Sequence, residues 1–279
     1  MSVSTPPCVV TFAGTDPSGG AGIQADIKAI SATGCYAASI ITALVAQNTV
    51  GVQAILEVPP EFIRQQIDSV FSDLTVHAVK IGMLHKQENM DVIATALSQL
   101  EVKHVVFDPV MVAKNGSPLL DPMLIHYLKT RMFPHCTLIT PNQPEAEALL
   151  SRPIETLSDM ALAAETLGET YHLNVLVKGG HFSQEDASDV LYMPSEKAHH
   201  WFHAGRIHTK NTHGTGCTLS SAIASYLAQG YRLTDAIQHA KRYLTRAIQA
   251  ASMQHIGHGF GPVDHFYFLD RTGCAYEEQ

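Results

Sequence analysis

The chain has 279 residues, of which 46% are hydrophobic and 16% charged, and its formal net charge at pH 7 is -8. This length and apolar content suffice for one large core, and no Pro/Gly/Ser-rich linker divides residues 1–279, so we expect a single domain. The acidic balance without a Lys/Arg-rich run excludes nucleic acid as the expected partner, although an acidic protein can still bind ATP with its Mg²⁺.

Targeting signals are not evident in the sequence. No stretch approaches the roughly 20 apolar residues of a membrane helix, and the N-terminus lacks the basic and apolar regions of a signal peptide. The five cysteines are odd in number and include no Cys-x-x-Cys pair, which is typical of a reducing compartment. We therefore expect a cytoplasmic protein without a membrane partner.

Short β-rich apolar runs alternate with longer helical patterns along the chain. The predicted strands are 8–14, 37–47, 78–81, 104–107, 137–140, 174–178, 189–193 and 201–208. The predicted helices are 21–32, 59–72, 89–100, 123–131, 144–150, 158–171, 218–228 and 233–253. This alternation indicates a mainly parallel central sheet with helices on both faces and a small antiparallel edge near the end. In such sheets ligands bind beyond the carboxyl ends of the strands.

Polar loops follow several of these predicted strands. Gly14 opens a glycine-rich loop that is neither a Walker A motif nor a Rossmann fingerprint. Asp26 lies in the next helix, and from its position alone we expect it to be a surface acid stabilised by the helix dipole. Gln47 ends the second strand, where an amide could pair with an aminopyrimidine edge or simply step out of the sheet.

Acidic and amide side chains recur at the ends of later strands. Asp108 lies at the tip of a buried strand, and Asn142 and Glu145 lie at a strand–helix junction. Such oxygens can hold hydrated Mg²⁺ near a nucleotide, although helix capping also explains Asn142. Lys178 ends a further strand and could contact a phosphate.

The segment 211–217, Asn-Thr-His-Gly-Thr-Gly-Cys, is the most informative in the chain. Its two glycines precede an apolar helix, whose free N–H groups and dipole favour an anion such as phosphate. Cys217 lies in the first turn, where the same field is expected to favour a thiolate, although a small buried cysteine is the alternative. Several histidines cluster nearby, and without a His-Glu-x-x-His motif we expect surface or edge-strand residues rather than a zinc site. These are His199, His200, His203, His208 and His213.

Taken in order, eight motifs resemble the ribokinase-like superfamily and, within it, the hydroxymethylpyrimidine/phosphomethylpyrimidine kinases of thiamine biosynthesis. They lie at 13–26, 46–49, 79–83, 108–112, 140–145, 177–181, 211–217 and 257–262. The resemblance implies a ribokinase-like three-layer α/β fold. It also implies ATP-dependent phosphorylation of 4-amino-5-hydroxymethyl-2-methylpyrimidine and then of its monophosphate, with ATP and Mg²⁺ as cofactors and a homodimer as the assembly.

The resemblance also assigns roles to residues of this chain. The catalytic turn is Gly214, Thr215, Gly216 and Cys217, with Cys217 as the candidate base. The substrate pocket would be lined by Gly14, Asp26, Gln47, Met83 and Val110. ATP and its phosphates would contact Lys178, Thr212 and Asn142, and Asp108 and Glu145 would lie near Mg²⁺.

Two alternatives remain open from the sequence. A pyridoxal kinase of the same superfamily is one, although a branch of those enzymes carries a second cysteine in the lid where this chain has Ala113. A catalytically silent sensor that binds a pyrimidine or pyridoxal phosphate is the other. Residues 112–118 are the expected lid.

Overall fold

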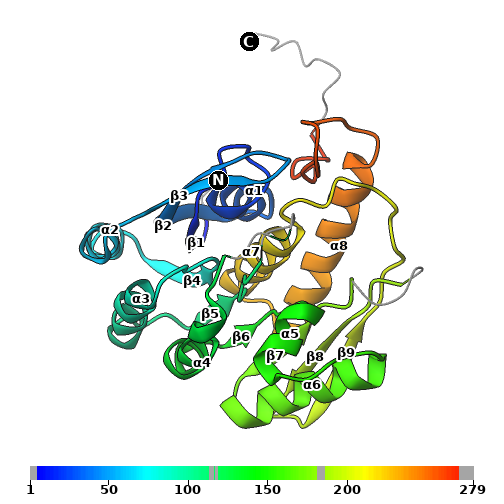
Figure 1. The fold of residues 1–279 in the computed structure, drawn as a ribbon. Helices are drawn as coiled ribbons and strands as arrows, with labels where there is room; N and C mark the ends of the chain where they lie inside the picture. The colour runs from blue at the N-terminus through cyan, green and yellow to red at the C-terminus, as the bar shows by residue number, and fades with distance from the viewer. Residues whose placement is uncertain (1–4, 113–115, 117–118, 181–185, 270–279) are drawn as a thin grey trace.

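The computed structural model describes residues 5–112, 116, 119–180 and 186–269. Within this part of the chain the strands form one nine-stranded sheet in the order β3-β2-β1-β4-β5-β6-β7-β8-β9. Helices cover both faces of the sheet (Figure 1), so the predicted three-layer architecture is confirmed. The expected lid falls largely on 113–115 and 117–118, and Ala113 and His181 also lie outside the described residues.

The element bounds follow the predicted pattern closely. The strands are β1 (Cys8–Gly14), β2 (Tyr36–Gln47), β3 (Val52–Glu57), β4 (Val76–Ile81), β5 (His104–Phe107), β6 (Leu138–Ile139), β7 (Asn174–Val177), β8 (Asp189–Met193) and β9 (Ala198–Phe202). The α-helices are α1 (Gly22–Ala32), α2 (Pro60–Phe71), α3 (Gln87–Gln99), α4 (Ile125–Met132), α5 (Gln143–Leu150), α6 (Leu157–Tyr171), α7 (Thr215–Ala228) and α8 (Leu233–Ala251). Two 3-10 turns, Pro122–Leu124 and Phe133–His135, flank α4.

Strand direction divides the sheet into a parallel centre and two antiparallel edges. β2, β1, β4, β5, β6 and β7 run parallel, and β8 and β9 add the predicted antiparallel edge. β3 was not predicted from the sequence, because its exposed residues carry no clear alternation, and it pairs antiparallel with β2. The prediction of a strand over 201–208 is wrong beyond Phe202, since Gly205 makes only an isolated bridge to Asp186.

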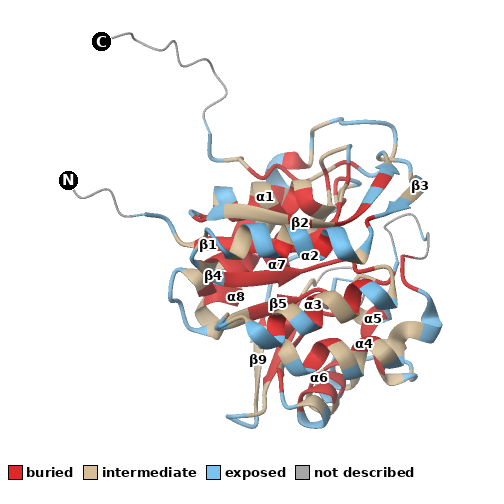
Figure 2. Cartoon of the chain, turned by 90° about the vertical axis from the view of Figure 1, so that its left-hand side faces the viewer, coloured by how far each residue is buried: buried red, intermediate tan, exposed pale blue. Residues whose placement is uncertain are grey.

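Alternating apolar residues in the central strands create two separate cores. Val10 of β1 and Val79 of β4 contribute to a core with α2, α3, α4, α5 and α6. Their neighbours Val9 and Ala78 contribute to the opposite core with α1, α7 and α8. Because strand side chains alternate between faces, one run of apolar residues serves both helical layers. β1 is buried along its whole length between these two layers (Figure 2).

The helix starts place the polar loops at one edge of the sheet. α7 begins at Thr215, three residues before the predicted start, because Gly214 adopts a φ of 77° and serves as its N-cap. α5 begins with a capping box between Asn142 and Glu145, so the capping explanation for Asn142 is confirmed.

Among the described residues no helix has both the length and the hydropathy of a membrane span.

Candidate active site

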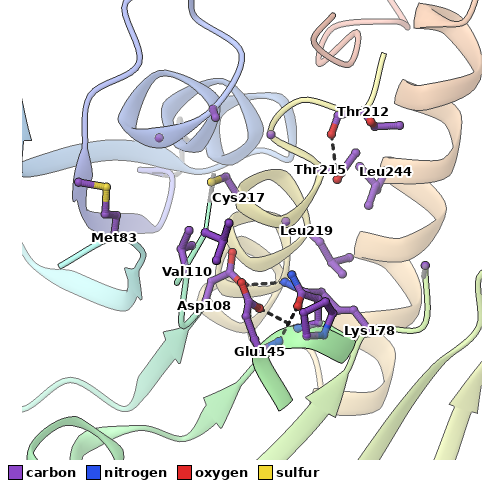
Figure 3. Close-up of a pocket in the computed structure, with 18 of the residues that line it drawn as sticks. Met83, Asp108, Val110, Glu145, Lys178, Thr212, Thr215, Cys217, Leu219 and Leu244 are labelled. Carbon is purple, nitrogen blue, oxygen red and sulfur yellow. Dashed lines mark hydrogen bonds and ion pairs between the residues drawn. The ribbon is translucent and has the colours of Figure 1, made fainter. Parts of the chain in front are cut away.

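A cavity of about 670 Å³ opens at the carboxyl ends of the parallel strands and under the N-terminus of α7 (Figure 3). Its volume lies in the range of small-molecule sites. The loops after β1, β4, β5, β6 and β7 all contribute to its wall. Met83 and Val110 lie toward one end, whereas Leu244 lies toward the other.

Two glycine loops contact each other above this cavity. A Cβ atom on Gly214 would collide with the carbonyl oxygen of Gly20, and one on Gly22 would collide with that of Gly14. Gly214 and Gly22 also have positive φ values of 77° and 55°, which side chains rarely adopt. Only glycine therefore allows the α7 turn to approach the first loop so closely.

The N-terminus of α7 faces an ion pair in the cavity wall. Lys178 Nζ lies 2.7 Å from Asp108 Oδ1, which also accepts a hydrogen bond from Thr140 Oγ1 at 3.1 Å. A Cβ atom on Gly216 would lie 3.2 Å from Asp108 Oδ2 and 3.3 Å from Lys178 Nζ. The free N–H groups of the helix and the lysine ammonium thus converge on one region, where they can hold a phosphoryl group.

Glu145 adds a second carboxylate beside this pair. One of its oxygens accepts the Asn142 N–H at 2.7 Å, while Glu145 N–H donates to the Asn142 side chain at 2.9 Å. Burial, reinforced by the charge of Asp108 and opposed by that of Lys178, raises the pKa of Glu145 to about 7. Although burial alone would lower it, Asp108 and Glu145 raise the pKa of Lys178.

These two carboxylates against one ammonium give the chemistry of a divalent cation site. The donors are oxygens, as Mg²⁺ requires, and Asp108 and Glu145 share the single cation Lys178. Among the described residues there is no cluster of three His, Cys, Asp or Glu side chains that could hold a metal by itself. The set fits a cation that brings further ligands with it, as Mg²⁺ does with nucleotide phosphates.

Cys217 lies in the first turn of α7, where its sulfur accepts a hydrogen bond from the Gly22 N–H. The expectation that the helix field would favour a thiolate is wrong for this structure. Burial, to which the carboxylates of Asp26 and Asp108 add, raises the pKa of the thiol to about 11, against the opposing effect of Lys80. At neutral pH the cysteine is a neutral thiol.

Asp26 does not reach the cavity wall, and it is not a surface acid either. It is fully buried and forms an ion pair with Lys80, whose Nζ lies 2.9 and 2.8 Å from its two oxygens. Thr11 and Ser221 also donate to it, at 2.6 and 2.8 Å. Four elements, β1, α1, β4 and α7, meet at this carboxylate one helical turn below Cys217.

The opposite wall of the cavity is built from Gly14, Gln47, Met83 and Val110. A Cβ atom on Gly14 would lie 3.3 Å from the Met83 methyl carbon, so the glycine leaves this wall flat. Gln47 reaches toward His213 from the end of β2. His213 is 7% exposed and pairs with Asp16 at 2.7 Å, so the prediction of a surface or edge-strand histidine is wrong for this residue.

The far end of the cavity could not be predicted from the sequence. There the loop before α7 and one face of α8 contribute several apolar and small residues, together with Arg206 and Lys241. The apolar and small residues are Ala204, Gly205, Ile207, Leu244, Thr245 and Ile248. The sequence predicted a helix over 233–253 but not that residues of this helix, α8, line a cavity.

Comparisons with known proteins agree with this geometry. A family model described as phosphomethylpyrimidine kinase matches residues 16–264. The hydroxymethylpyrimidine/phosphomethylpyrimidine kinase of Escherichia coli K12 is 47% identical over 259 residues, which cover 92% of this chain and 97% of that protein. The chain belongs to the phosphomethylpyrimidine kinase family.

Solved structures of a phosphomethylpyrimidine kinase and of a pyridoxal kinase are similar to the structure of this kinase. The phosphomethylpyrimidine kinase of Clostridium difficile 630 has a TM-score of 0.76 at 41% identity, covering 87% of this chain and 99% of that one. The ADP complex of Bacillus subtilis pyridoxal kinase has a TM-score of 0.86 at 32% identity, covering 95% and 99%. The ribokinase-like fold and the kinase assignment are thereby confirmed.

The cavity of this kinase brings together every predicted site residue except Asp26. Those that line it are Gly14, Gln47, Met83, Asp108, Val110, Asn142, Glu145, Lys178, Thr212, Gly214, Thr215, Gly216 and Cys217. Their individual roles remain predictions. Asp16 and the pair Lys241–Asp189 also line the cavity, with a distance of 2.6 Å between Nζ and Oδ2, and the sequence reasoning missed them.

Proposed function

We propose that this protein transfers the γ-phosphoryl group of ATP to 4-amino-5-hydroxymethyl-2-methylpyrimidine and then to the resulting monophosphate, for thiamine biosynthesis. The observation that carries the proposal is a single cavity with Gln47 and Met83 at one end, the α7 turn in the middle and a further space lined by Leu244 and Ile248 beyond it. The 47% identity to a hydroxymethylpyrimidine/phosphomethylpyrimidine kinase over almost the whole chain supports the same substrates.

ATP would extend from the Leu244 end of the cavity toward Lys178 and the α7 turn. The related pyridoxal kinase of Bacillus subtilis was solved as an ADP complex, which supports nucleotide binding by this fold. Asp108 and Glu145 would hold Mg²⁺, which neutralises phosphate charge when it is bound. Lys178, Thr212, Asn142 and the N–H groups of the turn would position the phosphoryl group.

The two phosphorylation steps require different chemistry from Cys217. In the first, the hydroxymethyl oxygen bonds to the γ-phosphorus as the bond to the β-phosphate oxygen breaks, ADP leaves, and the hydroxyl proton passes to the sulfur. The thiolate is a minor species at neutral pH because its pKa is about 11, but it is a strong base where present. In the second step the nucleophile is a phosphate oxygen that is already anionic, and a neutral thiol does not repel it.

Pyridoxal kinase activity is the second candidate, because the structure of the Bacillus subtilis pyridoxal kinase has a TM-score of 0.86 against this chain. The experiment is an ATP/Mg²⁺ assay that offers hydroxymethylpyrimidine, its monophosphate and pyridoxal in parallel, with products identified by mass. Two successive phosphate additions to the pyrimidine, with pyridoxal much slower, are the expected result. Turnover of pyridoxal alone would overturn the proposal, and no turnover at all would favour the silent sensor.

We also propose a cytoplasmic homodimer. Leu44 of β2 and Leu56 of β3 are cross-strand partners and are 46% and 65% exposed, so they form an apolar surface that a second copy could cover. The four cysteines of the described residues are free thiols, in keeping with a reducing compartment. Light scattering of the wild type and of Leu56→Asp tests the dimer, which the charge should dissociate.

A further inference from the structure

His213 connects three segments that are distant in the sequence. Its ring lies against Gly20, where any Cβ atom would collide with it, and its backbone N–H donates to the Gly261 carbonyl at 3.0 Å. Its Nε2 lies 2.7 Å from Asp16 Oδ2 and 3.2 Å from the amide nitrogen, Nε2, of Gln47. The ring is therefore fixed between the first glycine loop, the C-terminal segment and the end of β2.

Asp16 determines the role of the histidine nitrogen. Its carboxylate accepts N–H groups from Ser18, Gly20 and Ala21 at 3.0, 3.1 and 2.7 Å, which hold it in the ionised form. A carboxylate oxygen at 2.7 Å can only accept, so Nε2 of His213 must carry a hydrogen. This holds both for the neutral Nε2–H tautomer and for the imidazolium.

A hydrogen on Nε2 in turn decides how the Gln47 amide is turned. Two N–H donors cannot bond each other, whereas the amide oxygen can share the His213 hydrogen with Asp16. The amide oxygen and nitrogen exchange places by a half-turn of the terminal torsion. The arrangement that satisfies all three side chains has the Gln47 oxygen toward His213 and its NH₂ group toward the cavity, whose wall includes Gln47.

We propose that His213, held by Asp16, is a positioning residue that fixes the Gln47 amide as a hydrogen-bond donor to the substrate ring and so determines specificity for the pyrimidine. The proposal rests on the proposed function, because the ring that it recognises is an aminopyrimidine. A ring nitrogen of that substrate is an acceptor, which matches an NH₂ group and would repel an amide oxygen. An amide free to turn would present either group and lose this preference.

The test is a double-mutant cycle of His213→Phe and Gln47→Ala, measured by calorimetric binding of hydroxymethylpyrimidine without nucleotide. Phenylalanine keeps an aromatic ring against Gly20 but removes the Nε2 donor. We expect His213→Phe to weaken pyrimidine binding about tenfold in the wild-type background and hardly at all when Gln47 is alanine. His213→Gln, which can still donate, should restore most of the affinity, and circular dichroism checks the fold of each variant.

Steady-state kinetics separates positioning from a structural role. We expect His213→Phe to raise KM for the pyrimidine while kcat changes little. Additive effects in the cycle, or a loss of kcat with unchanged affinity, would overturn the positioning role while leaving the proposed function intact. Failure of the wild-type protein to bind hydroxymethylpyrimidine would instead overturn the proposed function.

Discussion

Two Lys–Asp pairs lie within this active-site region, and they differ in access to solvent rather than in chemistry. Lys80–Asp26 and Lys178–Asp108 have similar N···O distances of 2.8 and 2.7 Å. The side chains of the first pair are fully buried, whereas Lys178 is 13% exposed at the cavity wall. The comparison shows that one ion pair can anchor helices to a sheet while another of the same composition remains free to meet a ligand.

The sealed pair should matter most for stability. Lys80→Met would leave the Asp26 carboxylate buried without its cation, so we expect a loss of about 3–5 kcal/mol in the free energy of unfolding. Removing both charges, in Asp26→Leu/Lys80→Met, should recover much of that loss. Denaturant unfolding measures both effects.

A surface ion pair provides the control for this prediction. Lys86 pairs with Glu57 at 3.0 Å while both side chains are about half exposed, so Lys86→Met should change stability far less than Lys80→Met. Equal losses for Lys80→Met and Lys86→Met would contradict the distinction between a sealed and a solvated pair.

The accessible pair should matter most for turnover. Lys178→Met removes the cation that we propose contacts the transferring phosphoryl group, so we expect kcat to fall about 10²–10³-fold. The loss of stability should be smaller than for Lys80→Met, since water in the cavity can reach the remaining charge. Parallel measurement of kcat and of thermal unfolding checks the contrast, which would fail if Lys178→Met cost stability but little activity.

Cys217 lies between the two ion pairs, and charges from both pairs affect the pKa of its thiol. Its pKa of about 11 places the thiolate fraction at neutral pH about 100-fold below that of a thiol with the ordinary value of 9.0. We therefore expect alkylation of Cys217 by iodoacetamide, followed by peptide mass spectrometry, to accelerate up to about pH 11. Lys80→Met should slow it further, because the ammonium opposes the rise in pKa. Half-maximal reactivity below pH 9 would support the thiolate that the sequence suggested.

The sequence predicted what is local and failed on what depends on packing. The turn at Gly214 and the helix cap at Asn142 could be predicted because turn and capping geometry depends on adjacent residues in the sequence. Asp26 and His213 were misjudged, since their partners Lys80 and Asp16 are 54 and 197 positions away and only the assembled sheet brings them together. The helix dipole at Cys217 was recognised, but the burial and the two carboxylates that outweigh it were not visible.

Replacing the thiol with a carboxylate gives the narrowest test of how the two pairs shape the chemistry. Cys217→Asp would add a negative charge to a region that already holds Asp26 and Asp108, both of which raise the pKa of the cysteine. An incoming alcohol tolerates that charge, whereas an incoming phosphomonoester is repelled, by about 1–4 kcal/mol at about 4 Å. We expect the second phosphorylation to lose about tenfold more activity than the first, with Cys217→Ser as the neutral control that adds no repulsion to the second step. Equal losses in the two steps of Cys217→Asp would mean that the neutral thiol is not what lets one site accept both an alcohol and a phosphate.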